Sequence, residues 1–123
     1  MEQFEPRTKH GPEWRIQKEF VRYLQDRNWH VERMVGNAYQ TGIPDIYAMH
    51  IEFGQRWIDL KNPVSYEFTA AQRRKWPIWA AYGTPIWIIT CNDDYPKLFE
   101  PPNWRKYWKE KYNMTNEKAM EDL

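Results

Sequence analysis

Residues 42–63 read GIPDIYAMHIEFGQRWIDLKNP and hold two apolar segments, 45–51 and 56–61, separated by EFGQ. Alternating side chains on both sides of a glycine-containing connection predict a β-hairpin. Three charged residues interrupt the apolar pattern: Asp45, Asp59 and Lys61. Burying a charge without a partner is costly. We therefore expect these three charges to be compensated by other groups at a functional site.

The spacing of these charges predicts a phosphate-processing metal site. Residues two apart on a strand point to the same face, so Asp59 and Lys61 share a face while Ile58 and Leu60 take the other. If Asp45 begins the neighbouring strand, its carboxylate approaches Asp59, and a hard cation relieves the repulsion. Mg²⁺ suits such a pair because it leaves positions for water and phosphate oxygen. Lys61 can orient that water or offset charge developing at phosphorus.

The position of the turn determines whether the two acids meet. A hairpin centred on Gly54 places Asp45 opposite Pro63 instead of Asp59. Bringing the carboxylates together then requires a longer or skewed turn, a bulge, or a bend at Ile58.

The flanking segments predict an α/β fold. Apolar spacing indicates helices over 13–29 and 69–83, and strands over 29–35 and 84–91. Pro77 is expected to kink or interrupt the second helix, and the strongly apolar strand 84–91 is expected to lie in the centre of the sheet. The order αβββαβ predicts a mixed central sheet flanked by helices.

The C-terminal residues are less regular. Residues 92–103 contain three prolines and predict a loop, and 104–112 suggest a short amphipathic helix with Trp104, Tyr107, Trp108 and Tyr112 near one face. Packing of Trp104 and Trp108 on the core is expected, although the basic residues between these aromatics are a second candidate for nucleic-acid contact. We predict one domain over 1–123, with a core at about 13–91 and an extension over 92–123.

Composition excludes several classes of protein. The net charge is +1, from 18 basic and 17 acidic residues, so a polyanion must be met by a local patch. The single cysteine, Cys91, excludes an intrachain disulfide and a cysteine-based zinc site. The charged N-terminal residues do not resemble a signal peptide, and no apolar run approaches ~20 residues. A cytoplasmic protein without membrane spans is expected.

The motifs GIPDIY at 42–47 and WIDLK at 57–61 together resemble the bipartite signature of the PD-(D/E)XK nuclease superfamily. The resemblance is greatest to the branch containing VRR-NUC domains and archaeal Holliday junction resolvases, and it covers roughly residues 13–91. Four further residues match that branch in order and spacing: Glu13, Gln17, Gln72 and Gly83.

The resemblance implies a restriction-endonuclease-like core and Mg²⁺-dependent phosphodiester hydrolysis, with Mn²⁺ expected to substitute. Asp45, Asp59 and Glu13 would be metal ligands, Lys61 would lie beside the water, and Gln72 would be an accessory site residue. This chain has Asp59 where these relatives more often have Glu, which would draw the metal nearer to the strand.

Each site residue also has a structural interpretation. Asp45 can serve turn chemistry after a proline, and Asp59 with Lys61 can be an ion pair on a solvent-facing edge strand. Glu13 can favour a helix N-terminus, and Glu19 competes for its role. Gln72 can complete a capping box that begins at Thr69.

A basic run one turn beyond Gln72 is the predicted contact for a phosphate backbone: Arg73, Arg74 and Lys75. Its structural interpretation is an ordinary solvated helix face.

The sequence thus predicts a compact DNA endonuclease, either structure-selective for junctions or flaps, or site-specific as in restriction and homing enzymes. A homodimer is expected because cutting both strands needs two active sites, and a phage or mobile element is the expected source by analogy. The alternatives are a non-catalytic nucleic-acid-binding module on the same fold and a protein-interaction domain with a Trp-rich surface.

Overall fold

The structure is a computed structural model that describes residues 12–34 and 41–113, apart from the side chains of residues 12 and 13. Its elements follow the predicted order αβββαβ. They are α2 (Pro12–Asp26), β1 (His30–Arg33), β2 (Ile46–His50), β3 (Gly54–Leu60), α3 (Ala70–Ala81), β4 (Ile86–Ile89) and the 3₁₀ helices η1 (Asn92–Phe99) and η2 (Trp104–Tyr107).

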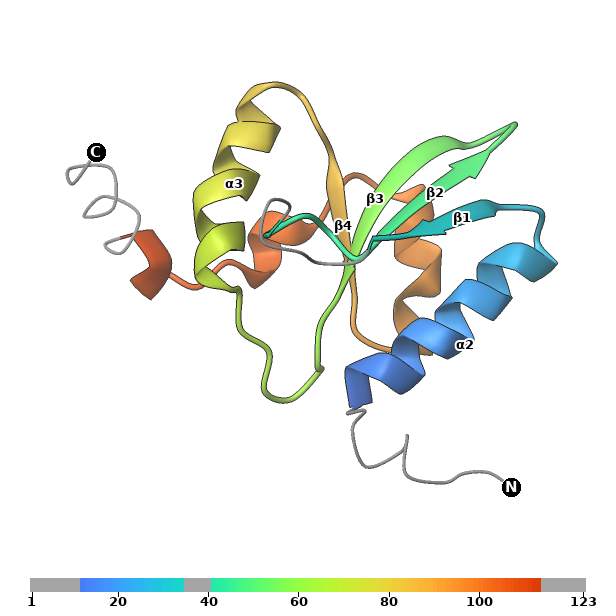
Figure 1. Cartoon of the computed structure of the whole chain (residues 1–123), viewed down its shortest axis with the longest axis horizontal. Coiled ribbons are helices and arrows are strands. Elements are labelled where there is room, and N and C mark those ends of the chain that lie inside the picture. Colours follow the sequence, from blue (N-terminus) through green and yellow to red (C-terminus); the bar gives the residue numbers. More distant parts are fainter. Residues whose placement is uncertain (1–11, 35–40, 114–123) are drawn as a thin grey trace.

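The four strands form a mixed sheet in the order β1-β2-β3-β4. The pairs β1/β2 and β2/β3 are antiparallel, and β3/β4 is parallel. The two long helices lie on opposite sides of the sheet, α2 on one face and α3 on the other (Figure 1). The predicted mixed sheet flanked by helices is confirmed.

Each face of the sheet buries its own apolar cluster. On the α2 face, Phe20 and Leu24 of the helix pack with Ile58 and Leu60 of β3. On the α3 face, Trp76 packs with Phe68 and with alternate residues of β4. Since neighbouring strand residues point to opposite faces, Asp59 lies among the α3-side residues, as the spacing predicts.

Strand β4 is not in the centre of the sheet, contrary to the prediction. It is the last strand of the sheet in the part of the chain that the structure describes. All four of its residues are nevertheless buried, and Asn103 occupies the open edge. Its Oδ1 accepts from the Ile88 N–H at 2.7 Å and its Nδ2 donates to the Ile88 carbonyl at 3.1 Å. A side-chain amide thus replaces the neighbouring strand that the apolar sequence predicts.

Helix α3 runs through Pro77 without interruption, so the expected break is absent. Proline costs a helix one backbone hydrogen bond, but the residues around it are held by tertiary contacts. Trp76 is fully buried and donates from its indole Nε1 to the Gly42 carbonyl at 2.7 Å, and Trp79 packs edge-on against Trp57. Packing therefore outweighs the local preference of the proline.

The C-terminal extension packs on both faces of the sheet. Residues 92–103, predicted to be a loop, contain the 3₁₀ helix η1, whose Leu98 belongs to the α2-side cluster. Trp104 of η2 is buried in the α3-side cluster, as expected. All eight tryptophans are buried or half-buried, so the Trp-rich interaction surface loses its basis.

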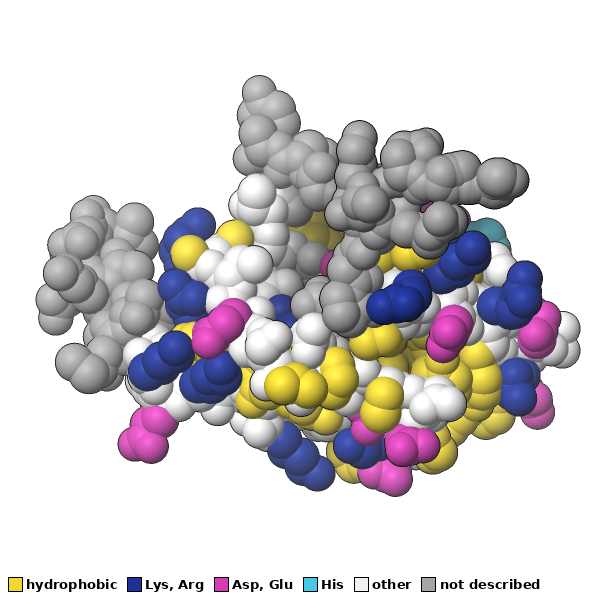
Figure 2. Space-filling view, turned by 90° about the horizontal axis from the view of Figure 1, so that it is seen from below, with side chains coloured by type: hydrophobic (Ala, Val, Ile, Leu, Met, Phe, Trp, Pro, Cys, Tyr) yellow, Lys and Arg dark blue, Asp and Glu magenta, His cyan; other side chains and the backbone are white. Residues whose placement is uncertain are grey.

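Charge is spread over the surface. On the face shown in Figure 2, Lys and Arg side chains are scattered among acidic and apolar ones. This distribution agrees with the net charge of +1. None of the helices in the described residues is long and apolar enough to span a bilayer.

Candidate active site

The β2–β3 hairpin places Asp45 directly opposite Asp59. His50 pairs with Gly54 and Ile46 with Ile58, and Asp45 and Asp59 follow by continuation of this register. The Asp45 N–H donates to Asp59 Oδ1 at 3.2 Å, and the Leu60 N–H donates to Asp45 Oδ2 at 2.9 Å. Each carboxylate is therefore held by a backbone group of the other strand.

The hairpin is centred on Glu52, so the arrangement about Gly54, which would place Asp45 opposite Pro63, does not occur. Ile51, Glu52 and Phe53 form the turn, and Gly54 already belongs to β3. Gly54 has φ +84°, a left-handed conformation that suits the residue closing a three-residue hairpin turn. Shifting the centre in this way brings the acids together without a bulge or a bend.

Lys61 is buried beside these acids and all three of its ammonium donors are used. Its Nζ lies 3.1 Å from Asp59 Oδ2, 2.7 Å from Gln72 Oε1 and 3.0 Å from the Glu67 carbonyl oxygen. Lys61 and Asp59 are only 4% and 1% exposed. The interpretation as a solvent-facing edge pair is therefore wrong.

Gln72 joins the site to the start of α3. It completes a capping box with Thr69, which accepts from the Gln72 N–H at 3.1 Å and donates its own N–H to Gln72 Oε1 at 3.0 Å. The other end of the same amide, Nε2, donates to both oxygens of Asp59 at 3.3 and 3.4 Å. Gln72 therefore has both arrangements that the sequence allowed, the helix cap and the contact with the site.

The loop before β2 is anchored against the same helix. Gly42 has φ +83°, and a Cβ there would lie 2.8 Å from the Ala71 backbone. The Gly42 carbonyl also accepts from the indole of Trp76 at 2.7 Å. Because only glycine fits this close approach, the segment GIPD is fixed on α3 and delivers Asp45 to the site.

Burial makes the two acids hard to ionise. Desolvation raises the pKa of Asp59 to about 8, the neighbouring Asp45 adds to the rise, and Lys61 opposes it. Desolvation also raises the pKa of Asp45, while the Leu60 N–H and Lys61 oppose that rise. One lysine thus compensates two carboxylates incompletely, and a further positive charge would stabilise their ionised forms.

The predicted third acid cannot be placed. Glu13 is the second residue of α2, but its side chain lies outside the described residues, so its role stays a prediction. Glu19, its competitor, is exposed. Burial raises the pKa of Tyr95 on the α2 face of the sheet, and the charge of Glu19 adds to that rise. Among the described side chains, no three acidic, imidazole or thiol groups lie together as a metal site.

The basic run does not form one continuous face. Arg73 turns inward, donating to the Phe68 carbonyl at 2.6 Å and lying 5.2 Å over the Tyr112 ring. Lys75 donates to the Thr41 carbonyl, and Arg74 is exposed. The predicted phosphate contact is therefore reduced to Arg74 and the neighbouring Lys75.

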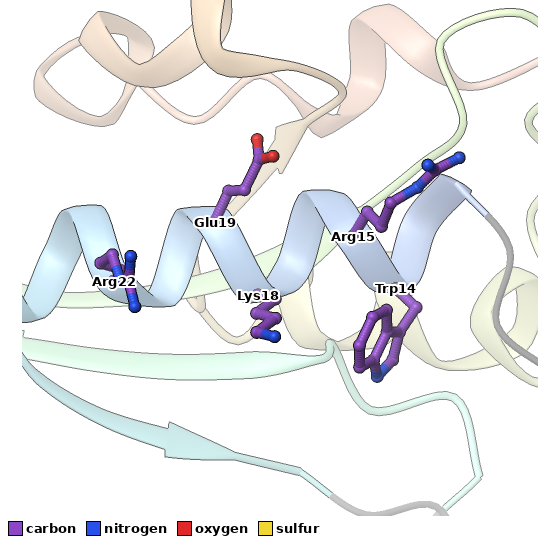
Figure 3. Close-up of a pocket in the computed structure, with 5 residues that line it drawn as sticks. All are labelled: Trp14, Arg15, Lys18, Glu19 and Arg22. Atoms are coloured by element: carbon purple, nitrogen blue, oxygen red, sulfur yellow. The ribbon is translucent and has the colours of Figure 1, made fainter. Parts of the chain in front are cut away.

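Helix α2 carries a second group of cations around a hollow of about 360 Å³. Trp14 and Lys18 point to one side of the helix and Arg15 and Glu19 to the other, with Arg22 one turn further along (Figure 3). Arg15, Lys18 and Arg22 are exposed. The sequence did not indicate a hollow here, because the spacing of an amphipathic helix defines a polar face without its shape.

Comparison with known proteins identifies the fold. A solved structure described as a VRR_NUC domain matches this chain with a TM-score of 0.61 and 16% identity, over 74% of this chain and 97% of that one. The chain has the VRR-NUC fold. The predicted resemblance is confirmed at the level of the fold, and the match covers nearly the whole of that domain.

No family model matches the sequence, and no curated protein matches it. At 16% identity the structural match establishes the fold alone. Any chemistry within the VRR-NUC fold therefore has to be argued from the site residues themselves.

Proposed function

We propose that this protein is a divalent-metal-dependent endonuclease that hydrolyses phosphodiester bonds in DNA. The observation that carries the proposal is the convergence of two acids, a lysine and a glutamine at one place in a nuclease-type fold. These residues come from the β2–β3 hairpin and the start of α3: Asp45, Asp59, Lys61 and Gln72.

The acids fit a hard cation by the chemistry of their donors. Two adjacent carboxylates with raised pKa values form a site in which added positive charge is favourable. Asp45 and Asp59, with Glu13 as the predicted third ligand, would hold Mg²⁺ or Mn²⁺. When bound, the ion would polarise the scissile phosphate and lower the pKa of a water.

Hydrolysis joins a water oxygen to phosphorus, breaks the bond from phosphorus to one ester oxygen, and leaves a proton on that ester oxygen. Negative charge develops on the phosphate oxygens as the water attacks. Lys61 would stabilise it by turning one N–H from a present acceptor towards a phosphate oxygen. Gln72 and the Asp45 N–H meanwhile fix the orientation of Asp59.

Binding of the DNA backbone is assigned to cations on α2 and α3, of which Arg74 is exposed and Lys75 is half-buried. Arg74 and Lys75 lie one turn beyond Gln72, and the α2 hollow carries three more basic residues: Arg15, Lys18 and Arg22. Such local groups are needed because the whole chain has little net charge. Cleavage of both strands would require a homodimer, and selectivity for junctions, flaps or a sequence would then depend on its geometry.

The proposal is tested with a panel of labelled substrates: single strands, duplex, flap and four-way junction DNA, and RNA. Each is incubated with Mg²⁺, Mn²⁺, Ca²⁺ or EDTA and with wild type or Asp59→Asn. We expect cleavage of at least one DNA substrate by wild type with Mg²⁺ or Mn²⁺ only. Cleavage that persists in EDTA or in Asp59→Asn would contradict the metal mechanism.

A second candidate function is a nucleic-acid-binding module without catalysis. It is favoured by one observation: the three ammonium donors of Lys61 already have acceptors within the protein. Retention of DNA without cleavage under every metal condition of the panel would support this candidate over the nuclease.

A further inference from the structure

The C-terminal extension reaches the candidate site through one tyrosine. Tyr112 is 2% exposed. Its hydroxyl donates to Glu67 Oε1 at 2.6 Å and accepts from the Phe68 N–H at 3.1 Å. Lys109 secures the same place by donating to Glu67 Oε2 at 2.8 Å and to the Tyr66 carbonyl at 2.9 Å. Residues 66–68 are thus attached to the C-terminal segment.

The other side of residues 66–68 holds the ammonium group of Lys61. The Glu67 carbonyl accepts from Lys61 Nζ at 3.0 Å, and the Phe68 ring lies 4.7 Å from the same nitrogen. Phe68 is itself 1% exposed. Movement of this short segment would therefore change two of the contacts that fix the charge beside Asp59.

Electrostatics make the attachment persistent at neutral pH. Hydrogen bonds from Lys109 and Tyr112 lower the pKa of Glu67 to about 2. The Glu67 side chain is therefore a carboxylate at neutral pH, and it accepts both hydrogen bonds in its charged form. Hydrogen bonds to a charged acceptor are stronger than neutral ones.

We propose that Tyr112 is a positioning residue for the hydrolysis assigned above. Its hydroxyl holds residues 66–68 so that the Glu67 carbonyl and the Phe68 ring keep the Lys61 ammonium beside Asp59. The inference rests on the proposed function for its effect on rate, but the contacts themselves are independent of it. The proposal assigns residues outside the matched motifs a role in positioning Lys61.

The ring and the hydroxyl of Tyr112 have separable roles. The ring packs against Phe68 and Trp108 at centroid distances of 5.5 and 5.2 Å, which is a structural contribution. Tyr112→Phe keeps this packing and removes the two hydroxyl contacts. A matched control is Tyr95→Phe, because Tyr95 also packs against aromatic rings but is half-buried in the cluster on the α2 face.

The first measurement is the single-turnover cleavage rate with saturating DNA and Mg²⁺, beside DNA affinity in Ca²⁺. Tyr112→Phe should lower the rate roughly 10-fold or more, because misplacing a catalytic group is costly, while affinity stays within about 2-fold of wild type. Tyr95→Phe should leave both unchanged. In a Lys61→Met background, Tyr112→Phe should have no further effect on the residual rate.

The second measurement does not depend on activity. In the metal-free protein, the NMR signal of the Lys61 Cε methylene, assigned by its loss in Lys61→Met, should shift in Tyr112→Phe and stay in place in Tyr95→Phe. Glu67→Ala, which removes the acceptor at an exposed position, should shift the same signal. The Glu67→Ala variant therefore still tests the proposal if Tyr112→Phe fails to fold.

The outcomes separate the two proposals. An unshifted Lys61 signal in both Tyr112→Phe and Glu67→Ala would overturn the positioning role, as would equal effects of Tyr112→Phe with and without Lys61. If wild type cleaves nothing, the proposed function fails, and the Lys61 signal still decides whether Tyr112 positions the lysine.

Discussion

Asn103 pairs with the backbone of Ile88 through both ends of its amide, accepting at 2.7 Å and donating at 3.1 Å. Both residues are buried. The amide satisfies two backbone groups that β4 would otherwise leave without a partner, and an unsatisfied buried group costs about 1–3 kcal/mol. The C-terminal extension thus completes the sheet.

The first prediction follows from this pair. Asn103→Ala should lower the free energy of unfolding by about 2–4 kcal/mol, because it leaves the Ile88 N–H and carbonyl buried and unpaired. Urea unfolding followed by tryptophan fluorescence measures this. Asn92→Ala, at an exposed position in η1, should change stability by less than about 0.5 kcal/mol. Equal changes in the free energy of unfolding for the two variants would show that the Asn103 amide does not stabilise the edge of β4.

The second prediction concerns the paired acids. Asp45→Asn and Asp59→Asn keep the size of each side chain but remove a charged oxygen ligand, so each should lower metal-dependent cleavage by roughly 10²-fold or more. The double variant should be little worse than either single one, since the two acids act as a unit. Asp93→Asn, an exposed acid of η1, should cleave like wild type. The measurement is the single-turnover cleavage rate. A wild-type rate in Asp45→Asn or Asp59→Asn would contradict the assigned role of the paired acids.

The third prediction is a pH dependence of stability in the metal-free protein. The folded pKa of Asp59 is about 8, against an ordinary value of 3.8. Between these values the folded protein keeps a proton that the unfolded chain has released. The free energy of unfolding should therefore fall as pH rises, by at most roughly 1.4 kcal/mol per pH unit.

This dependence has a direct control. Asp59→Asn cannot ionise, so in EDTA its stability should change less than that of wild type between pH 5 and pH 8. At pH 8 the variant should be the more stable protein. Parallel stability–pH curves for the two proteins, from urea unfolding, would show that Asp59 does not titrate in this window.

The fourth prediction separates chemistry from binding at Lys61. Lys61→Met keeps the apolar stem but removes the charge that lies 3.1 Å from Asp59, and it should lower the single-turnover rate by roughly 10²-fold or more. DNA affinity in Ca²⁺ should fall far less, because the charge matters most as the water attacks. Lys61→Arg should restore little, since a planar fork replaces a compact charge. A wild-type rate in Lys61→Met would refute the assigned role.

The fifth prediction compares two basic groups. Arg74→Gln with Lys75→Gln should reduce the magnitude of the salt dependence of DNA binding by about 0.9 for each phosphate that the protein no longer neutralises. Replacing Arg15, Lys18 and Arg22 of α2 with Gln should likewise reduce the salt dependence of DNA binding. Arg73→Gln is different, because its inward contacts predict a loss of stability and an unchanged salt dependence. If the dependence of log affinity on log salt in either group of variants equals that of wild type, that group is an ordinary solvated surface.

Much of the arrangement follows from local pattern. The alternation around Asp59 separates Ile58 and Leu60 from the charged face, and this holds in the structure because a strand has a period of two. Apolar spacing along the chain predicted the element order, and the motifs at 42–47 and 57–61 carried the resemblance to VRR-NUC domains. Gln72 was identified by its match to the VRR-NUC pattern, and its spacing from Thr69 indicated the second arrangement, the capping box, since that box depends on residues only three apart.

Other features depended on contacts between distant residues. The uninterrupted helix at Pro77 and the edge position of β4 each went against the local indication. In each case long-range packing or hydrogen bonding, such as that of Trp76 and Asn103, outweighs the preference of a short segment.

The sequence by itself determined the types of residue at the candidate site, the faces on which they lie and the order of the elements, because these depend on backbone periodicity. The tertiary structure alone decided that Asp45 meets Asp59, that Lys61 is buried with all three donors engaged, and that Tyr112 supports residues 66–68 from a distant part of the chain. Those relationships arise from register, desolvation and contacts between residues far apart in sequence, which no local pattern encodes.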